Sequence, residues 1–330
     1  MKYLNIKHGE HCFVLLRLNS ARSLLHRLEG NHEIAVGEVD KLVNQQQQAP
    51  QSQRDNAAMG HVVLQRALNS IQVDDLIQAE QILGHWRHLG DDEPSLMEHV
   101  VYFRRDVMLG RVLRARGRFA EAHTHLKRSY DLAAQHHGLD FDEDRRDLIS
   151  ELADTLLELD KPYDAEAYLR IEFARRSRDM NDPAKSGKSL LEASMAEVLL
   201  AQGRTEEAEH VCSQAEARWD ELMRLGKFRI CIVRAKIHHT RSDYATAVRY
   251  WDMALQQASI FQGETGATTR ILVLSRQVSR QASGLTDPEA FERCTDLSTV
   301  PVKPGGTLYW IAGMRHWENF VRSEAARTRV

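Results

Sequence analysis

One segment of the chain resembles the loop by which many nucleotide-binding proteins hold phosphate groups. It reads Asp182-Pro183-Ala184-Lys185-Ser186-Gly187-Lys188-Ser189, and its last three residues are those that such a loop requires. A phosphate-binding loop begins with glycine and joins a strand to a helix, so that backbone amides point at the phosphate. Here Asp182 stands at the first position, and the segment connects two predicted helices. We interpret it as a polar connector, with nucleotide binding as the alternative.

Metal binding is the second chemistry that the residue types suggest, because several of the 16 histidines occur in close pairs. The pairs are His85/His88, His123/His125, His136/His137 and His238/His239. A metal site needs three or four converging ligands, and no pair has a neighbouring cysteine or a His-Glu-x-x-His arrangement. The cysteines form no Cys-x-x-Cys pair; they are Cys12, Cys212, Cys231 and Cys294. We predict no metal site, no disulfide framework and no cofactor.

The sequence contains no local signature of an active site. It has no nucleophile elbow and no glycine-rich dinucleotide turn, and no carboxylate pair stands out at catalytic spacing. We therefore name no catalytic residues and predict that the protein is not an enzyme. A catalytic site assembled only by folding stays open as an alternative, which a deep closed pocket with strongly perturbed titratable groups would favour.

Net charge and hydropathy indicate which kinds of partner and which cellular compartment to expect. The net charge of the 330 residues is −3, which gives no global field to attract nucleic acid or an anionic membrane. No stretch approaches the roughly 20 apolar residues that span a bilayer, and the apolar run from Cys12 to Leu16 is too short for a signal sequence. We predict a cytoplasmic or nuclear protein. Three arginines between residues 17 and 27 leave organellar import open.

A repeat runs through most of the chain. Six pairs of a small residue and an alanine lie twelve residues apart, and a turn residue precedes each alanine by five positions. The pairs are Ser23/Ala35, Ala67/Ala79, Gly110/Ala122, Ala153/Ala165, Ala196/Ala208 and Ala235/Ala247. The turn residues are Gly30, Asp74, Gly117, Asp160, Gly203 and Ser242. Successive alanines are 44, 43, 43, 43 and 39 residues apart, which indicates six structural units.

This spacing predicts two closely packed antiparallel helices in each unit. Helices that cross closely need small side chains where their backbones approach, and glycine or aspartate ends the first helix. Four residues after each alanine, one turn along the second helix, stands an apolar residue on the same face. These residues are Val39, Leu83, Leu126, Leu169, Cys212 and Trp251.

The units resemble tetratricopeptide repeats. The best-formed one reads Leu109-Gly110-Arg111-Val112-Leu113 and then Gly117-Arg118-Phe119-Ala120-Glu121-Ala122, and the unit from Met195 to Ala208 follows the same pattern. The period of about 43 residues, instead of 34, resembles kinesin light chains and the solenoids of signal-transducing ATPases. The resemblance covers residues 17–262. It departs from the family pattern at Arg22, Arg66 and Arg234, which stand where the family has large apolar residues.

The resemblance implies an all-α, right-handed solenoid of about six helix-turn-helix units, with repeat helices from about Phe13 to Phe261 and no sheet. We assign residues 1–262 to this solenoid, 263–283 to an additional helix and 284–330 to a turn-rich linker and a last helix. That helix, from Leu308 to about Ala326, is expected to cap the apolar end of the array. The units are centred near 22–43, 66–87, 109–130, 152–173, 195–216 and 234–255.

In the family, the first helix of each unit lines a concave groove, and the resemblance transfers this role to matching positions. These are Leu68, Ile71, Val107, Arg111, Arg114, Ser150, Asp154, Leu157, Ala193, Glu197, Leu200, Ile232, Lys236 and His239. Arg111 and Arg114 would form a basic wall, because they lie one turn apart on one helix, and Asp154 and Glu197 an acidic wall. The alternative is that Arg111 and Asp154 pair with each other across adjacent units.

These observations predict a non-enzymatic scaffold or adaptor that binds an extended or helical segment of a partner protein in the groove. The alternative is a ligand- or peptide-responsive regulatory subunit, in which the last helix occupies the groove until a ligand displaces it. The partner is predicted to be a protein or peptide, and no nucleic acid or membrane is implied.

Overall fold

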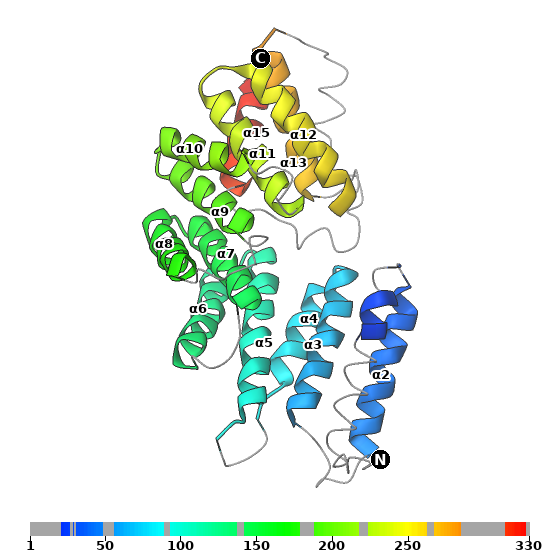
Figure 1. Cartoon of the computed structure of the whole chain (residues 1–330). Helices are drawn as coiled ribbons and strands as arrows, with labels where there is room; N and C mark the ends of the chain where they lie inside the picture. The colour runs from blue at the N-terminus through cyan, green and yellow to red at the C-terminus, as the bar shows by residue number, and fades with distance from the viewer. Residues whose placement is uncertain are drawn as a thin grey trace, which may run out of the picture.

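The computed structural model describes residues 21–26, 29, 31–48, 56–88, 93–136, 142–178, 188–217, 224–262, 267–284 and 314–327. Within these ranges the chain forms helices, turns and short connections, and no strand occurs. The predicted all-α solenoid is confirmed (Figure 1). Helical residues 21–26 are followed by α2 (His32–Gln48), α3 (Asn56–Gln72), α4 (Leu76–His85), α5 (Leu96–Ala115), α6 (Phe119–Gln135), α7 (Asp142–Glu158), α8 (Pro162–Arg178), α9 (Lys188–Ala201), α10 (Thr205–Glu216), α11 (Arg224–Thr240), α12 (Tyr244–Gln262), α13 (Ala267–Ala282) and α15 (Met314–Arg327).

Several sequence-based expectations concern residues outside these ranges. They are the helix start near Phe13, the turn at Gly30, most of the phosphate-loop-like segment, and the first residues of the C-terminal helix, from Leu308 to Gly313. Cys12 and Cys294 also lie outside the described residues. The division of the chain at residues 262 and 283 stays a prediction.

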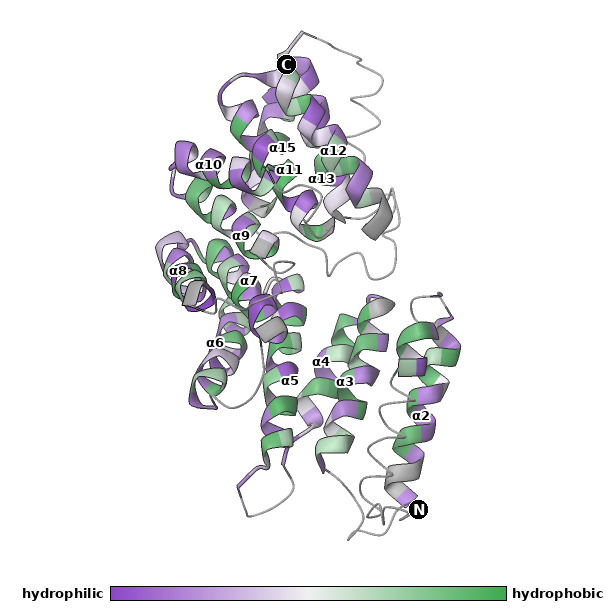
Figure 2. Cartoon of the chain, viewed as in Figure 1, coloured by the Kyte–Doolittle hydropathy of each residue, from purple (hydrophilic) through white to green (hydrophobic). Residues whose placement is uncertain are grey.

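The helices pack as antiparallel pairs that stack into a curved array. Within units, α3 packs on α4, α5 on α6, α7 on α8, α9 on α10 and α11 on α12. Between units, the first helices α3, α5, α7, α9 and α11 form one row, since each packs on the next along the chain. The second helices form the other row, and Figure 2 shows both green apolar and purple polar residues along the helices of both rows. The helices bury apolar residues against their neighbours, and in α9 every residue from Ser189 to Leu199 is buried.

The turns between paired helices adopt the left-handed backbone conformation that the sequence predicted. Their φ angles lie between 57° and 77°, at Asp74, Gly117, Asp160, Gly203 and Ser242. In the third unit, Arg118 N donates to Leu113 O at 2.8 Å and Gly117 N donates to Arg114 O at 2.9 Å. These bonds satisfy carbonyls at the end of α5 and reverse the chain into α6.

The repeat alanines lie at the helix crossings, and each is fully buried; they are Ala35, Ala79, Ala122, Ala165, Ala208 and Ala247. The apolar residue four positions later is also fully buried in every unit, from Val39 to Trp251. In the third unit the first helix carries Gly110 at the crossing, and a β-carbon there would collide with Leu126. The small residue is therefore required by the close approach of α5 and α6.

Arginines that follow the turn glycines connect consecutive units on the second-helix side. Arg118 Nη1 donates to Glu80 Oε1 of the preceding unit at 2.6 Å, and its Nε donates to Glu121 at 2.7 Å. The equivalent residue two units later, Arg204, bonds to Glu166 at 2.8 Å and to Glu207 at 2.6 Å. These arginines are about one-third exposed, so solvent weakens each ion pair, and the pairs serve mainly to set the register of neighbouring units.

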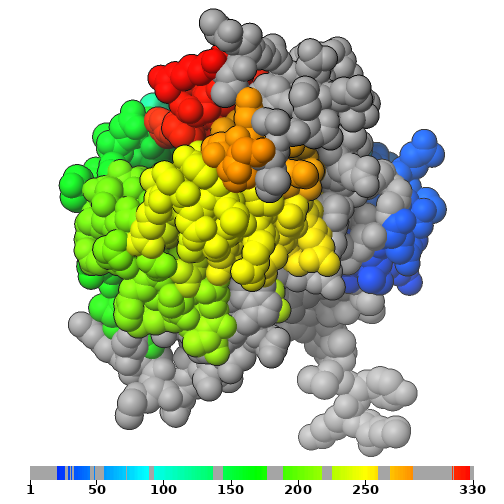
Figure 3. All heavy atoms as spheres, turned by 90° about the horizontal axis from the view of Figure 1, so that it is seen from above, coloured from blue at the N-terminus to red at the C-terminus, as the bar shows by residue number. Residues whose placement is uncertain are grey.

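The C-terminal end of the array is covered by α13 and α15. Met314, Trp317 and Val321 of α15 are buried in the apolar cluster that contains Trp251, whereas Phe320 is 39% exposed. Figure 3 shows α15 (red) directly beside α13 (orange). The predicted capping helix is therefore present, because an array of repeats exposes an apolar end face that needs a cover.

Replacing Gly110 by alanine tests the close helix crossing. We expect Gly110→Ala to lower the free energy of unfolding by about 1–3 kcal/mol, because the new β-carbon displaces Leu126. The control is Gly84→Ala in α4, where a β-carbon meets nothing within 4 Å and the better helix former should stabilise. Urea unfolding followed by circular dichroism measures both. Equal effects of the two substitutions would contradict the close approach.

Candidate protein-binding site

The groove-facing side of the first helices is held together by buried polar contacts between consecutive units. The first contacts join α5 to α7, where one carboxylate accepts from two arginines. Arg111 Nε donates to Glu151 Oε1 at 2.9 Å, and Arg114 Nη2 donates to Glu151 Oε2 at 2.8 Å. Although burial disfavours the carboxylate, the two guanidiniums hold the pKa of Glu151 below its ordinary value. Arg114 is only 5% exposed and therefore acts inside the protein.

The next contacts join three units around one guanidinium. Arg229 of α11 donates from Nη2 to Asp154 Oδ1 at 2.6 Å and from Nη1 to Ser150 Oγ at 3.0 Å, both on α7. Ser150 also bonds to Ser194 of α9 at 2.9 Å. Arg229 is 3% exposed, so the sixth unit reaches the fourth through the interior. Here hydrogen bonds connect the first helices of three units.

Two further contacts extend the series to the C-terminal helices. Lys236 Nζ of α11 lies 3.0 and 3.2 Å from the carboxylate oxygens of Glu197 on α9, and both side chains are buried. His239 Nδ1 bonds to Ser279 Oγ of α13 at 2.8 Å. We call this series the polar ladder; its members are Arg111, Arg114, Glu151, Ser150, Ser194, Asp154, Arg229, Glu197, Lys236, His239 and Ser279.

The structure thus brings most of the polar residues predicted for the groove together, but as partners of other units. The alternative in which Arg111 pairs with Asp154 is not what the structure shows, since Arg111 bonds to Glu151 and Asp154 to Arg229. Predicted apolar groove residues of the second to sixth units lie in apolar clusters; they are Leu68, Ile71, Val107, Leu157, Ala193 and Ile232. The assignment of these residues to partner binding stays a prediction.

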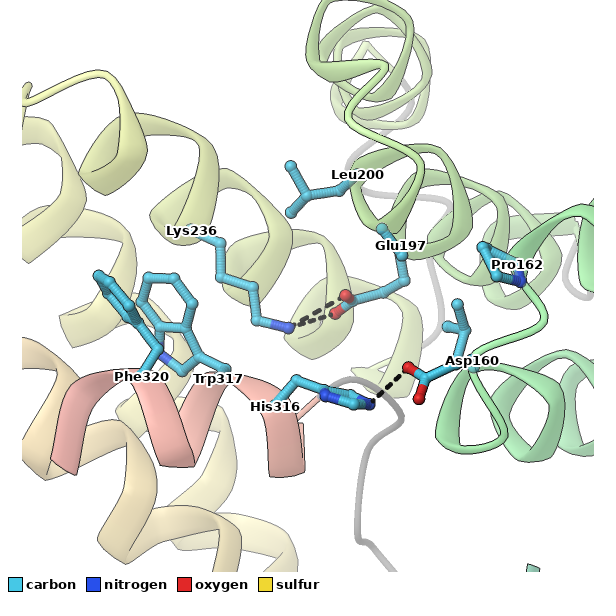
Figure 4. A pocket seen from close by; sticks show the side chains of 10 residues that line it. Asp160, Pro162, Glu197, Leu200, Lys236, His316, Trp317 and Phe320 are labelled. Atoms are coloured by element: carbon cyan, nitrogen blue, oxygen red, sulfur yellow. Dashed lines mark hydrogen bonds and ion pairs between the residues drawn. The ribbon is translucent and has the colours of Figure 1, made fainter. Parts of the chain in front are cut away.

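A pocket of about 510 Å³ opens beside the polar ladder, and α15 forms one of its walls (Figure 4). We call it the C-terminal pocket. Four residues predicted for the groove line it together: Leu157, Glu197, Leu200 and Lys236. The sequence analysis did not assign the other lining residues to the groove; they are Asp160, Pro162, Ala201, His316, Trp317 and Phe320.

The C-terminal pocket combines apolar walls with paired charges. Leu200 faces Trp317 and Phe320 across it (Figure 4). The buried pair of Glu197 with Lys236 contributes no net charge to one wall. His316 Nε2 lies 3.4 Å from Asp160 Oδ1, and because both side chains are more than half exposed, this pair can rearrange around a ligand.

Comparison with known proteins agrees with this geometry. A tetratricopeptide-repeat family model matches residues 104–128 and 191–211, which fall in the units of α5/α6 and α9/α10. A solved structure of kinesin light chain TPR-like repeats from Podospora anserina is 19% identical, with a TM-score of 0.50 over 63% of this chain and 95% of that one. The chain therefore has a TPR-like repeat fold. A search of curated protein sequences finds no match.

Two further structures share this TPR-like fold over a larger part of the chain. A Rap protein complexed with Competence and Sporulation Factor is 14% identical, with a TM-score of 0.57 over 86% of this chain and 76% of that one. The apo quorum sensor NprR from B. thuringiensis is 12% identical, with a TM-score of 0.56 over 89% and 79%. At these identities the likeness concerns the fold.

Metal sites and membrane-spanning helices can be assessed only among the residues that the structure describes. Among them, no three or more histidine, cysteine, aspartate or glutamate side chains converge as metal ligands. None of their helices has the length and hydropathy needed to span a membrane. Histidines of the sequence pairs contact other groups, since His88 bonds to Glu98 at 2.7 Å and His238 to Asp243 at 3.0 Å.

His239 connects the polar ladder of the TPR-like array to α15. Its ring lies edge-on to Trp317 and Phe320, with centroids 5.4 and 5.7 Å apart, and edge-on to Tyr244 at 5.2 Å. Burial lowers the pKa of His239, and the charge of Glu324 on α15 opposes this shift only in part. The imidazole is therefore neutral at pH 7, as its apolar surroundings require.

The pair of Arg229 with Asp154 can be tested by a double-mutant cycle. We expect Asp154→Ala to lower the free energy of unfolding by about 3–5 kcal/mol, because it leaves a guanidinium buried without its carboxylate. Adding Arg229→Met should recover much of that loss. Urea unfolding measures each variant. A cost below about 1 kcal/mol for the single substitution, or additive costs in the double variant, would contradict the buried pair.

The depressed pKa of His239 predicts an acid-dependent loss of stability. The unfolded chain binds this proton more readily than the folded chain, so protonation favours unfolding. The contribution of neutral His239 to the free energy of unfolding is complete above the ordinary pKa of about 6.5, and it decreases by at most about 1.4 kcal/mol per pH unit as the pH falls below that value. His239→Gln should flatten the dependence between pH 7.5 and 5.5, and His210→Gln at an exposed position should not. Urea midpoints followed by tryptophan fluorescence measure this. Identical slopes for all three proteins would refute it.

Proposed function

We propose that this TPR-like repeat protein is a non-enzymatic scaffold or adaptor that binds a segment of a partner protein in the C-terminal pocket. The observation that carries the proposal is the position of this pocket. The polar ladder joins the first helices at Arg229, whereas beside Leu157 and Leu200 an open, largely apolar cavity remains between the units and α15. Its volume of about 510 Å³ is within the range of ligand-binding clefts.

The chemistry of the walls favours an occupant with an apolar anchor. The buried pair of Glu197 with Lys236 is satisfied internally, so a charged anchor would gain little there. Aromatic surfaces from Trp317 and Phe320 offer contact area for an aliphatic or aromatic side chain. The exposed His316 and Asp160 stand at the edge, where polar groups of an extended or helical segment would lie.

The comparisons add support of a general kind. One protein of similar fold is a Rap protein seen in complex with a factor, and another is a quorum sensor. A TPR-like array binds segments of other proteins through its concave side as a rule of the architecture. We therefore propose a protein or peptide partner, rather than nucleic acid or membrane, for this chain of net charge −3. We also propose that it works in the cytoplasm or nucleus.

One observation favours the second candidate, a peptide-responsive regulatory subunit. α15 supplies His316, Trp317 and Phe320 to the C-terminal pocket, so an occupant would touch this helix directly. A ligand that binds one position of α15 better than another shifts the helix toward that position. In this candidate, α15 transmits occupancy of the pocket to the end of the array.

Photo-crosslinking and substitution at Leu200 test the proposed site. A photoreactive phenylalanine analogue at Leu200 should crosslink to a partner in an extract of the source cells, and the same group at Leu96, which is 60% exposed on α5 outside the pocket, should not. With the purified partner, Leu200→Glu should weaken binding at least about tenfold, because it places a carboxylate among apolar groups. Leu96→Glu is the matched control.

Two results would contradict this assignment. One is equal crosslinking of the partner from Leu200 and Leu96. The other is undiminished affinity of Leu200→Glu, with helical content by circular dichroism confirming that the variant is folded.

A further inference from the structure

The second-helix side of the array carries a groove that the proposed function does not use. It lies between α8, α9 and α10, has a volume of about 500 Å³, and we call it the outer groove. Its α9 residues include Met195 and Leu199, whereas the C-terminal pocket uses Glu197 and Leu200 of the same helix. At 100° per residue these two sets point to opposite sides of α9. The two cavities therefore open on different faces of the protein.

The outer groove has a counterpart two units earlier, between α4, α5 and α6, with a volume of about 470 Å³. Lining residues of the two grooves match at a separation of 86 residues, which is two repeat periods. The matching pairs are Leu109/Met195, Leu113/Leu199, Glu121/Glu207 and His125/Val211. Equivalent repeat positions therefore line both grooves.

One repeat position lines both grooves and carries a larger side chain in other units. Three residues after the repeat alanine, successive units carry His125, Tyr168, Val211 and Tyr250. The ring of Tyr168 packs edge-on against Tyr130 at 4.9 Å, and Tyr250 stacks on His238 at 5.5 Å and donates to Glu216. Tyrosine therefore fills this position in the fourth and sixth units. Histidine and valine are smaller and line open grooves in the third and fifth.

The outer groove combines an apolar floor with an acidic edge. The floor is made by Phe173, Met195, Leu199 and Val211, and the charged lining consists of three carboxylates and one guanidinium, from Glu192, Glu206, Glu207 and Arg170. Glu206 and Glu207 have side chains that are 84% and 57% exposed. In the earlier groove, two arginines, Arg116 and Arg118, balance the two glutamates. Carboxylates therefore outnumber arginines among the residues that line the outer groove, whereas the two are balanced in the earlier groove. Glu207 and Glu206 of the outer groove also pair with Arg204 and Arg241, which do not line it.

We propose that the outer groove docks an amphipathic helical segment of a partner protein, with apolar side chains on the floor and lysine or arginine side chains against the glutamates. A furrow between neighbouring helices is the shape into which the apolar face of a further helix packs. The carboxylates at the edge select basic residues beside that face. Arg204 and Arg241 hold Glu207 and Glu206 at 2.6 Å, which keeps both carboxylates at the edge of the groove.

The test uses a synthetic peptide of about 14 residues with leucines at helical spacing and lysines elsewhere, and a second peptide with glutamates in place of lysines. Binding to the full chain is measured by fluorescence anisotropy. We expect the lysine peptide to bind, and the glutamate peptide to bind at least about tenfold more weakly. Affinity for the lysine peptide should fall with added salt, because the contact with the glutamates is screened.

Equivalent positions of two units provide a test variant at Val211 and a control variant at His125. Val211→Tyr places in the fifth unit the residue that the fourth and sixth carry, so the groove is filled by a side chain that the repeat accommodates elsewhere. It should weaken binding of the lysine peptide at least about tenfold. His125→Tyr fills the earlier groove and should leave the affinity within about twofold. The double substitution Glu206→Lys and Glu207→Lys should make the chain prefer the glutamate peptide over the lysine peptide. Because both side chains are exposed, this change of preference does not depend on packing.

Several results would overturn the proposal. They are unchanged binding by Val211→Tyr, an equal loss in His125→Tyr, and equal affinity for the lysine and glutamate peptides. A wild-type chain that self-associates in light scattering, and becomes monomeric in Val211→Tyr, would show that a second copy of the chain occupies the groove and would also overturn it. Because Val211 of α10 lines the outer groove and Leu200 of α9 lines the C-terminal pocket, failure here is distinguishable from failure of the function proposed for the C-terminal pocket.

Discussion

The need to pair charges that are buried between first helices constrains the whole array. A buried guanidinium or carboxylate without a partner costs several kcal/mol, so each polar residue on the inner side must find its partner on another unit. Arg229 meets this requirement by reaching Asp154 two units away, and Glu151 by accepting from Arg111 and Arg114 together. These contacts fix how far each unit rotates relative to the next. The C-terminal pocket lies beside these contacts, since Glu197 and Lys236 of the polar ladder line it.

The two cavities have a common origin in α9, whose neighbours differ on its two sides. On the inner side, pairing draws α7, α9 and α11 together at Ser194 and leaves space beside Leu200, which α15 encloses in part. On the outer side, Val211 lines the space between α8 and α10, at a position where the fourth and sixth units carry tyrosine. A repeat array can therefore form binding surfaces on both faces without changing its backbone, by varying single positions within the unit.

The fold was predictable from sequence because its determinants are local and repeated. The spacing of Ala122, Ala165 and Ala208 and their preceding turn residues is a consequence of one helix crossing that recurs in every unit. The site was predictable only in part. First-helix positions identified the inner side, but Arg229 and Glu151 were missed because partners on other units depend on the rotation between units, which no local pattern encodes. Trp317 lies in the pocket because α15 packs on α13, and a contact between these two helices is not encoded by a local pattern.

The most direct test of this account is hydrogen–deuterium exchange of the full chain, free and with its bound partner segment. The amides of the first helices α9 and α11 should exchange slowly in the free protein, because the polar ladder holds them together. Binding in the C-terminal pocket should add protection at the end of α9 around Leu200 and along α15 around Trp317. Rapid exchange of α9 and α11 in the free protein, or protection by the partner confined to the second helices, would contradict the account.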